Sequence, residues 1–201
     1  MIFMKEKIRA FIAFEIRDPN ILKNIDILQN ELINVLKPQR IKPVELENIH
    51  LTLRFLGDID LNTASSLYEF IEENINNNIL KSRKLRFNLI GLEDFNKRTF
   101  FIKLEGSVED MKTLKEIHRI IENEIITNYK FNRDKDFKAH ITIGRLKEDR
   151  SYKRANESFA GYINLKSQYK DKNLGEVIFD KLKLKKSTLT PTGPIYEDLR
   201  F

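Results

Sequence analysis

The sequence predicts a fold of mixed strands and helices, arranged as two similar lobes that face each other across a cleft. Short apolar segments typical of buried strands alternate with segments whose apolar residues recur every three or four positions, as on one helix face. The same order occurs twice, over 41 residues from Arg9 to His50 and 42 residues from Arg98 to His140. With 201 residues, 41% of them hydrophobic, the chain is long enough for one globular core.

The near-register repeat indicates an internal duplication. The chain is therefore expected to be a single domain, residues 1–201, whose halves cover about 8–97 and 98–201. Two repeats are too few for a solenoid, so the halves are expected to face each other.

The first half is predicted to contain three strands and two helices. The strands, which are rich in aliphatic and aromatic residues, are Arg9–Ile16, Ile49–Leu56 and Leu85–Leu92. Asp18 and Pro19 are the residue types of a helix N-cap and first turn, and Pro38 and Pro43 are expected to close that helix. Gly57-Asp58 is expected to end the second strand. A second helix is predicted from Leu61 to about Ile75, ended by the asparagine cluster Asn74–Asn78.

The second half repeats this order and then becomes less regular. Strands are predicted at Arg98–Leu104 and Phe137–Leu146, and Ser107 with Asp110 resembles a capping box at the start of the helix between them. The apolar stripe of that helix is Met111, Leu114, His118, Ile121 and Ile125. The region 145–173 is predicted to hold a short helix, a strand around Gly161–Leu165 and an exposed basic loop.

A last strand is predicted over Glu176–Leu189, with Lys181, Lys183 and Lys185 on one face. Such a lysine row is typical of a solvated or protected sheet edge, and contact with nucleic acid is the alternative.

Charge and composition narrow the classes of function. The 36 Lys and Arg exceed the 30 Asp and Glu, which gives a net charge of +6 and a pI of about 9.3. This favours an anionic partner such as nucleic acid, although it also serves solubility. With no cysteine, disulfides, thiolate nucleophiles and Cys-based zinc sites are excluded. Without a long apolar run or a signal-like N-terminus, a cytoplasmic location away from membranes is expected.

Two of the three histidines lie in the same tetrapeptide pattern, His-apolar-Thr-apolar. The two copies are His50-Leu51-Thr52-Leu53 and His140-Ile141-Thr142-Ile143. On a strand, residues i and i+2 share one face, so each copy presents an imidazole and a hydroxyl on one side and two core residues on the other. If the halves are pseudo-symmetric, the cleft holds two histidines and two threonines.

This group suits metal-independent phosphodiester cleavage. An imidazole pKa near 6.5 allows one ring to act as a base on water and the other as an acid toward the leaving oxygen. A bell-shaped pH dependence with a maximum between about pH 6 and 8 is therefore expected. Threonine hydroxyls can donate to non-bridging phosphate oxygens. No metal-ligand motif is recognisable, so no metal or other cofactor is expected, and His118 is expected to pack on its helix.

The chain resembles the two-histidine (2H) phosphoesterase superfamily, in particular the RNA 2′,3′-cyclic phosphodiesterases also called 2′-5′ RNA ligases. The resemblance rests on RAFIAFEI, IHLTLRFLGD, FKAHITIGRL and the closing PTGPIYEDL. It implies an α+β fold of two pseudo-symmetric lobes with antiparallel sheets lining a central cleft and helices outside. It implies that His50 protonates the leaving ribose oxygen, that His140 is the general base, and that Thr52, Thr142 and Arg145 bind phosphate.

Two residues depart from what this pattern would suggest. Many relatives have proline just before the second motif histidine, and this chain has Ala139. Strict alternation would also turn Arg145 away from the face of His140, so its role requires a strand end or a bulge after Gly144.

The resemblance implies a monomeric enzyme that hydrolyses RNA-terminal 2′,3′-cyclic phosphate to a 2′-phosphate, with tRNA fragments among the candidate substrates. One alternative is the reverse reaction, ATP-independent 2′-5′ RNA ligation. A second is a non-catalytic RNA-binding module, and a third is hydrolysis of a small cyclic nucleotide or an ADP-ribose cyclic phosphate.

Overall fold

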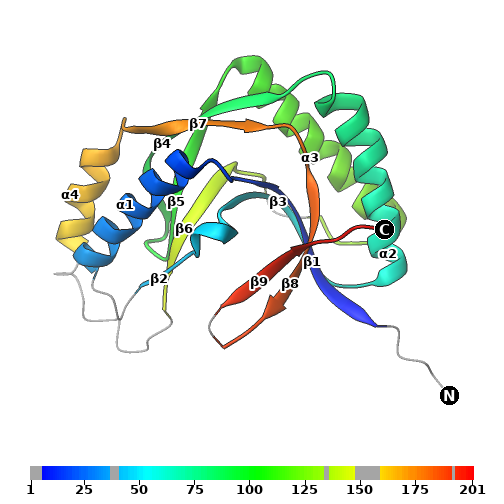
Figure 1. Ribbon diagram of the computed structural model, residues 1–201, viewed down its shortest axis with the longest axis horizontal. Helices are drawn as coiled ribbons and strands as arrows, with labels where there is room; N and C mark the ends of the chain where they lie inside the picture. Colours follow the sequence, from blue (N-terminus) through cyan, green and yellow to red (C-terminus); the bar gives the residue numbers. More distant parts are fainter. Residues whose placement is uncertain (1–5, 37–40, 134–135, 148–158, 192) are drawn as a thin grey trace.

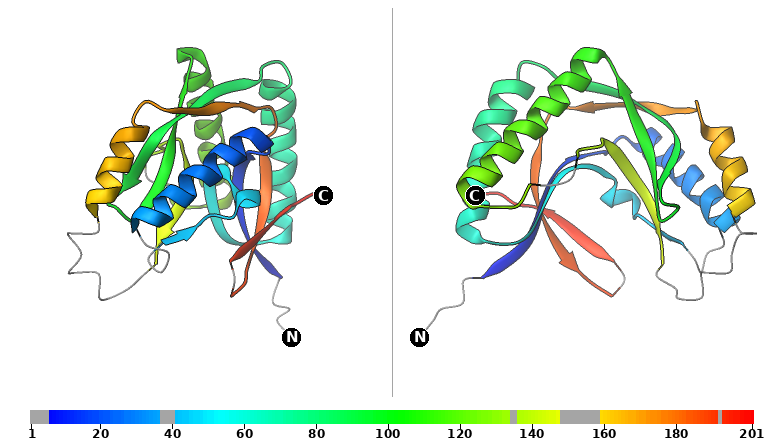
Figure 2. Two further views of the ribbon diagram at one scale, coloured as in Figure 1. Left: turned by 60° about the vertical axis from the view of Figure 1, so that its left-hand side comes forward. Right: turned by 180° about the vertical axis from the view of Figure 1, so that it is seen from behind.

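The computed structural model describes residues 6–36, 41–133, 136–147, 159–191 and 193–201. In this part of the chain, nine strands form one sheet in the order β7-β4-β5-β6-β3-β1-β8-β9, with β2 beside β6. All of the strand pairs in this sheet are antiparallel. The sheet bends into an arch whose outer side carries the helices (Figures 1 and 2). The predicted α+β architecture with antiparallel strands and outer helices is therefore confirmed.

The elements follow the predicted order with some changes of bounds. The strands are β1 (Lys7–Glu15), β2 (Ile41–Pro43), β3 (His50–Asp60), β4 (Leu85–Phe95), β5 (Thr99–Gly106), β6 (His140–Leu146), β7 (Asn173–Phe179), β8 (Lys183–Leu189) and β9 (Pro194–Asp198). The helices are α1 (Pro19–Leu36), the short η1 (Leu46–Asn48), α2 (Leu61–Phe70), its π-helical continuation η2 (Ile71–Leu80), α3 (Val108–Tyr129) and α4 (Ala160–Tyr169).

The two arms of the arch are built alike around their shared centre. β1 pairs with β3 in one arm, β5 pairs with β6 in the other, and β3 and β6 meet between them. Each arm also takes strands from the other half of the chain, because β4 of the first half lies between β5 and β7, while β8 and β9 of the second half extend the arm of β1. We therefore propose that the molecule arose by duplication, with strands exchanged between the halves.

Both long helices begin as their sequences predict. The Asp18 carboxylate accepts hydrogen bonds from the backbone N–H groups of Asn20 and Ile21, at 2.8 and 3.1 Å. Ser107 Oγ accepts one from the Asp110 N–H at 3.0 Å, which caps α3. These bonds satisfy N–H groups that have no partner within a helix. Pro38, which was expected to close α1, lies outside the described residues.

The prediction that Gly57-Asp58 ends the second strand is wrong. β3 continues to Asp60, and its register against β1 shifts between the pairs Phe11–Phe55 and Ala10–Gly57. Gly57 has a φ of +67° at this bulge, a backbone conformation that glycine adopts without steric cost. The glycine therefore bends the strand and does not stop it.

The predicted end of the second helix and the predicted last strand are wrong for one shared reason. η2 continues through the asparagine cluster, where Asn76 is buried. The Asn76 amide donates to the backbone oxygen of Leu182 at 3.0 Å and accepts from its N–H at 2.8 Å. These bonds hold the chain where it leaves β7 for β8, so Glu176–Leu189 forms parts of two strands far apart in the sheet.

The prediction of a strand around Gly161–Leu165 is also wrong, because these residues belong to α4. Tyr162, Leu165 and Tyr169 are buried at spacings of three and four residues, which matches a helix and not an alternating strand. α4 packs beside α1, where Gly161 lies against Val35. Residues 148–158 of the region 145–173, in which a short helix and a basic loop were also expected, lie outside the described residues.

The lysines of the predicted last strand are neither at a sheet edge nor free for nucleic acid. β8 lies between β1 and β9, and Lys183 and Lys185 each pair with both Glu15 and Asp198. We call these four residues the ion quartet. The Lys185 side chain is only 7% exposed. Exposed Lys181 pairs instead with Glu72 at 3.2 Å.

His118 lies on α3 and stacks on Phe137, with ring centroids 4.4 Å apart. This contact agrees with the predicted packing role.

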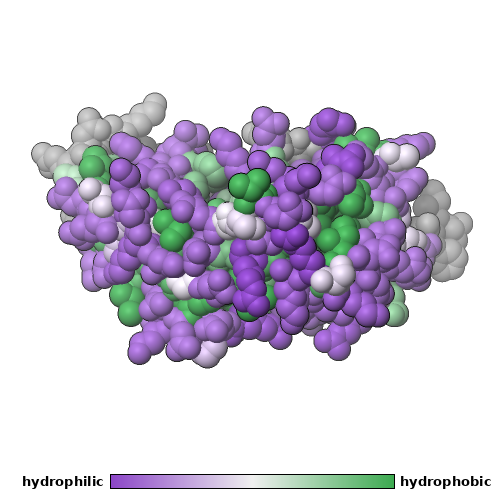
Figure 3. Space-filling model, turned by 90° about the horizontal axis from the view of Figure 1, so that it is seen from above, coloured by the Kyte–Doolittle hydropathy of each residue, from purple (hydrophilic) through white to green (hydrophobic). Residues whose placement is uncertain are grey.

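The face of the molecule seen from above the view of Figure 1 is mostly hydrophilic, with small hydrophobic groups scattered over it (Figure 3). In the described part of the chain, no helix has the length and apolar character needed to cross a membrane.

Candidate active site

The two His-apolar-Thr-apolar motifs lie on neighbouring central strands. Leu51 of β3 is directly opposite Ile141 of β6. Around this antiparallel pair, the register sets His50 toward Thr142 and Thr52 toward His140. Both apolar residues of each motif are buried, whereas the histidines and threonines are half-buried. The predicted division between a reactive face and a core face is therefore confirmed for both motifs.

Each histidine is anchored in the same way. The Nδ1 atom of His50 lies 2.6 Å from the backbone oxygen of Asn48, and that of His140 lies 2.6 Å from the backbone oxygen of Lys138. Because a carbonyl oxygen can only accept, each Nδ1 carries the hydrogen. In the neutral ring, Nε2 then has a free lone pair. This tautomer is the one that can take a proton from water through Nε2.

A bulge in each motif strand decides which side chains follow the motif into the cleft. Leu53 is the extra residue between the pairs Ala13–Thr52 and Ile12–Arg54. Ile143 is the equivalent extra residue on β6, between the pairs Phe101–Thr142 and Phe100–Gly144.

The second of these bulges supplies what Arg145 needs. It returns the alternation so that Arg145 comes to the face of Thr142, and it lies just before Gly144 where the sequence suggested a bulge just after it. The bulge in β3 does the same for Phe55, which is 56% exposed. The two arms thus place an arginine and a phenylalanine at equivalent positions.

A cavity of about 450 Å³ lies between the arms, and we call it the main cleft. It is lined by four predicted site residues: His50, Thr52, Thr142 and Arg145. His140 is absent from the described residues that line this cavity, but it lies two residues from Thr142 on the same face of β6. The structure therefore brings four of the five predicted residues around one space and sets the fifth at its side.

Aromatic rings surround both imidazoles, and sequence reasoning did not assign these rings to the site. The centroid of His50 is 5.1 Å from that of Phe11 and 5.5 Å from that of Tyr196. His140 lies 4.9 Å from Phe95 and 5.2 Å from Phe101. These rings come from four other strands, so only alternation within each strand could have hinted at them.

Burial and nearby cations lower the pKa of both imidazoles. Burial is the largest cause at His50; together with Lys185 and Arg145 it outweighs the hydrogen bond to the Asn48 oxygen and lowers the pKa to about 4. Burial and then Arg145 lower the pKa of His140, against the opposing effect of the Lys138 oxygen. Both rings are therefore set toward the neutral form in the free protein.

The site gathers imidazoles and hydroxyls and not a set of metal ligands. Across the part of the chain that the structure describes, no group of three or more histidines, aspartates or glutamates is placed to hold a metal ion.

Comparison with known proteins places these features in a family context. Residues 10–198 match the family described as the AKAP7 2′5′ RNA ligase-like domain. The chain is 31% identical over 194 residues to the RNA 2′,3′-cyclic phosphodiesterase of Archaeoglobus fulgidus, covering 96% of this chain and 98% of that protein. It is also 31% identical over 192 residues to the enzyme of the same name from Methanocaldococcus jannaschii, with the same coverage.

Solved structures show the same fold. Escherichia coli LigT complexed with 3′-AMP aligns with a TM-score of 0.67 at 16% identity, covering 97% of each chain. TT0787 of Thermus thermophilus aligns with a TM-score of 0.64 at 24% identity, covering 96% of this chain and 95% of that one.

Proposed function

Since the chain belongs to the AKAP7 2′5′ RNA ligase-like domain family, within the 2H phosphoesterases, we propose that it hydrolyses RNA-terminal 2′,3′-cyclic phosphates. The observation that carries the proposal is the matched pair of imidazoles. Each is held through Nδ1 by a backbone oxygen, and the motifs that carry them meet at the centre of one sheet. Two such rings supply the base and the acid that the reaction needs.

The proposed reaction is an in-line displacement at phosphorus. A water oxygen bonds to phosphorus while Nε2 of His140 takes a proton from that water. The bond from phosphorus to the ribose 3′ oxygen breaks, and protonated His50 gives its Nε2 proton to that oxygen. The product is a 2′-phosphate with a free 3′-hydroxyl. The roles of base and acid follow the family resemblance.

Three further side chains are proposed to hold the phosphate. Thr52 and Thr142 can each donate a hydroxyl hydrogen to a non-bridging oxygen, and the Arg145 guanidinium can balance the charge. All three line the main cleft. A bound phosphate anion also favours the protonated form of the imidazoles, which offsets the lowered pKa of the proposed acid, His50.

The proposed substrate is RNA, because the cyclic phosphate requires a 2′-oxygen that DNA lacks. The surplus of 36 Lys and Arg over 30 Asp and Glu favours an anionic polymer of this kind. We infer that the protein acts as a monomer in the cytoplasm on RNA ends such as those of tRNA fragments. The absence of cysteine from the sequence agrees with a reducing compartment.

The reverse reaction uses the same two histidines by microscopic reversibility. It would join a cyclic-phosphate end to a 5′-hydroxyl through a 2′-5′ linkage, and the family description that matches residues 10–198 refers to this activity. Water at ~55 M favours hydrolysis unless binding energy holds the second RNA end in place.

A turnover assay in excess EDTA tests the proposed activity. A short RNA ending in a 2′,3′-cyclic phosphate is expected to be converted fully to the 2′-phosphate, because imidazoles and hydroxyls supply the chemistry. Mass spectrometry detects the opening of the cyclic phosphate, and resistance of the product to a 3′-phosphate-specific phosphatase identifies it as the 2′-phosphate. Binding without turnover would indicate an RNA-binding module, and a rate abolished by EDTA and restored by a metal would indicate a metal-bound water.

The pH dependence is expected to differ between the free enzyme and its complex. A lowered pKa means that the ring loses its proton at lower pH, so the acid form disappears as pH rises through that pKa. With the His50 pKa near 4 and that of His140 also lowered, kcat/KM should peak below about pH 6.5.

Bound phosphate raises both pKa values, so kcat should peak at higher pH than kcat/KM. The maximum between about pH 6 and 8, which is expected for imidazoles of ordinary pKa, should therefore apply to kcat and not to kcat/KM. Rates measured over pH 4 to 9 at saturating and at limiting substrate check this. Coincident maxima would show that the lowered pKa values do not govern the free enzyme.

A further inference from the structure

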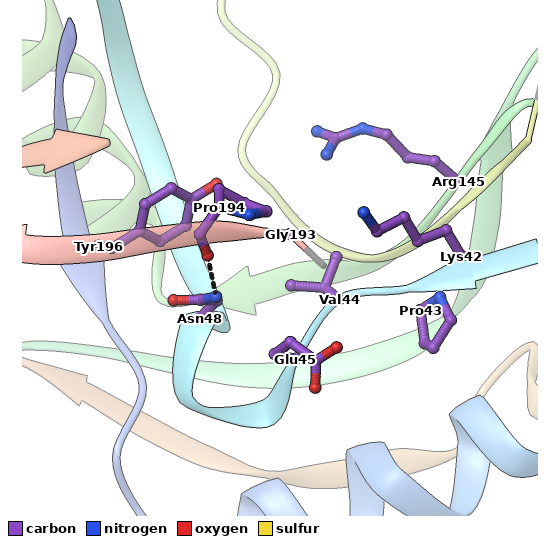
Figure 4. Close-up of a pocket in the computed structure, with 9 residues that line it drawn as sticks. All are labelled: Lys42, Pro43, Val44, Glu45, Asn48, Arg145, Gly193, Pro194 and Tyr196. Atoms are coloured by element: carbon purple, nitrogen blue, oxygen red, sulfur yellow. Dashed lines mark hydrogen bonds between the residues drawn. The ribbon is translucent and has the colours of Figure 1, made fainter. Parts of the chain in front are cut away.

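A second, smaller cavity opens beside the main cleft. Its volume is about 160 Å³, and it shares Val44, Arg145, Pro194 and Tyr196 with the main cleft. Lys42 of β2 lines only the smaller cavity. Figure 4 shows the Lys42 ammonium and the Arg145 guanidinium extending over this cavity from the same side, with Tyr196 facing them. A ligand that extends from the main cleft past Arg145 would therefore reach Lys42.

Lys42 and Arg145 form an unbalanced pair of positive charges. They are directly opposite each other in the β2–β6 pair, so their side chains emerge on the same face of the sheet. Within the described residues, neither forms an ion pair with an acidic side chain, although Glu45 also lines the cavity (Figure 4). Like charges placed opposite each other destabilise a sheet, so folding alone does not explain the pair.

The floor of the cavity leaves space for an anion beside Lys42. A Cβ atom added to Gly193 would lie 3.8 Å from the Lys42 Nζ atom, so the bare glycine leaves room for close approach. The neighbouring wall is fixed, because the Asn48 amide donates to the Pro194 oxygen at 3.0 Å and the Val44 N–H donates to the Ile143 oxygen at 3.0 Å.

We propose that this small cavity binds the phosphodiester on the 5′ side of the terminal nucleotide, with Lys42 as its cationic ligand and Arg145 shared between the two phosphates. The inference rests on the proposed function, since the cyclic phosphate must occupy the main cleft. It makes the enzyme selective for a nucleotide chain over a cyclic mononucleotide. The observed arrangement supports this, because Arg145 lines both cavities and Lys42 lines only the smaller one.

The test compares a cyclic mononucleotide with a dinucleotide that ends in the same cyclic nucleotide. For the wild-type protein, kcat/KM should be about 10- to 100-fold higher for the dinucleotide, the usual contribution of hydrogen bonds to a charged group. Lys42→Met should remove most of this preference and leave kcat/KM for the mononucleotide unchanged. A methylphosphonate at the internal linkage, which removes its charge, should lower the wild-type preference at least as much. Its effect should be smaller on Lys42→Met, where only the Arg145 contact to that linkage is left to lose.

A matched control is Lys112→Met, since Lys112 is an exposed lysine on α3. It should keep the full preference for the dinucleotide. The slope of log kcat/KM against log salt for the dinucleotide should become shallower by about one in Lys42→Met and not in Lys112→Met.

Two results would overturn the inference while leaving the proposed function intact: equal kcat/KM for the two substrates, or a preference that survives Lys42→Met. A preference that survives both Lys42→Met and the methylphosphonate but changes with the penultimate base would show that the cavity binds a nucleobase. If wild type hydrolyses neither substrate, the proposed function itself fails.

Discussion

Replacing either His50 or His140 by alanine is expected to lower kcat/KM for a cyclic-phosphate RNA by roughly 10²- to 10⁴-fold, the usual contribution of a positioned acid or base. Each ring is held by a backbone oxygen 2.6 Å from its Nδ1 atom, so each Nε2 is already oriented in the free protein. Because the two rings act in one displacement, the double variant should lose far less than the product of the single losses.

The two roles can be separated with a phosphodiester whose leaving group is 4-nitrophenolate. Such a group departs without a proton, so loss of the acid should matter little with this substrate. His50→Ala should then recover most of its activity, and His140→Ala should not. The opposite pattern would exchange the two roles, a result that the low pKa of His50 in the free protein makes informative.

His118→Ala is the matched control for both histidines. The ring stacks on Phe137 outside the main cleft, so its loss should reduce stability and leave kcat unchanged. A folded His118→Ala protein with a loss of activity equal to that of the motif variants would contradict the assignment of the catalytic pair.

Local sequence signals predicted most of the elements because each depends on residues close together in the chain. The Asp18 cap and the apolar face of α1 are of this kind. The errors arose where a distant residue decided the outcome. Asn76 lies in an asparagine cluster typical of a helix end, yet its side chain hydrogen-bonds to the backbone of Leu182, a residue 106 positions away. No local pattern contains that contact.

The residues of the candidate site likewise fall into those that local sequence predicts and those that depend on distant contacts. The motif residues were predictable because alternation on a strand fixes which side chains share a face. Arg145 needed a bulge, and the bulge at Ile143 depends on the register against β5. Lys42 gave no local signal, since its place beside Arg145 comes from the pairing of β2 with β6. Long-range pairing is what a single sequence leaves open.

The ion quartet is expected to carry a large part of the stability of the arm built on β1 and β3. Lys185→Met should lower the free energy of unfolding by about 3–5 kcal/mol, because it leaves the half-buried carboxylates without their one buried cation. Lys183 and Lys185 each contact both Glu15 and Asp198, and the Lys185 side chain is 7% exposed. Urea unfolding followed by circular dichroism measures the loss, with the slope against denaturant as a check on two-state behaviour.

The control and the pH dependence identify the quartet as the cause. Lys181→Met removes a cation that is 54% exposed and paired with Glu72, so it should cost at most about 1 kcal/mol. Burial raises the pKa of Asp198, but the two lysines outweigh it and lower the pKa to about 2. A carboxyl whose pKa is lowered by folding contributes stability above its unfolded pKa, and this contribution is lost as pH falls through the folded pKa.

The difference in unfolding free energy between wild type and Lys185→Met should therefore be full at neutral pH and shrink as pH falls from about 4 toward 2. Adding Glu15→Gln to Lys185→Met should cost less than the sum of the two single losses, because each single variant already breaks the same contact. Additive losses, or a Lys185→Met loss no larger than that of Lys181→Met, would show that the four charges do not act as one unit.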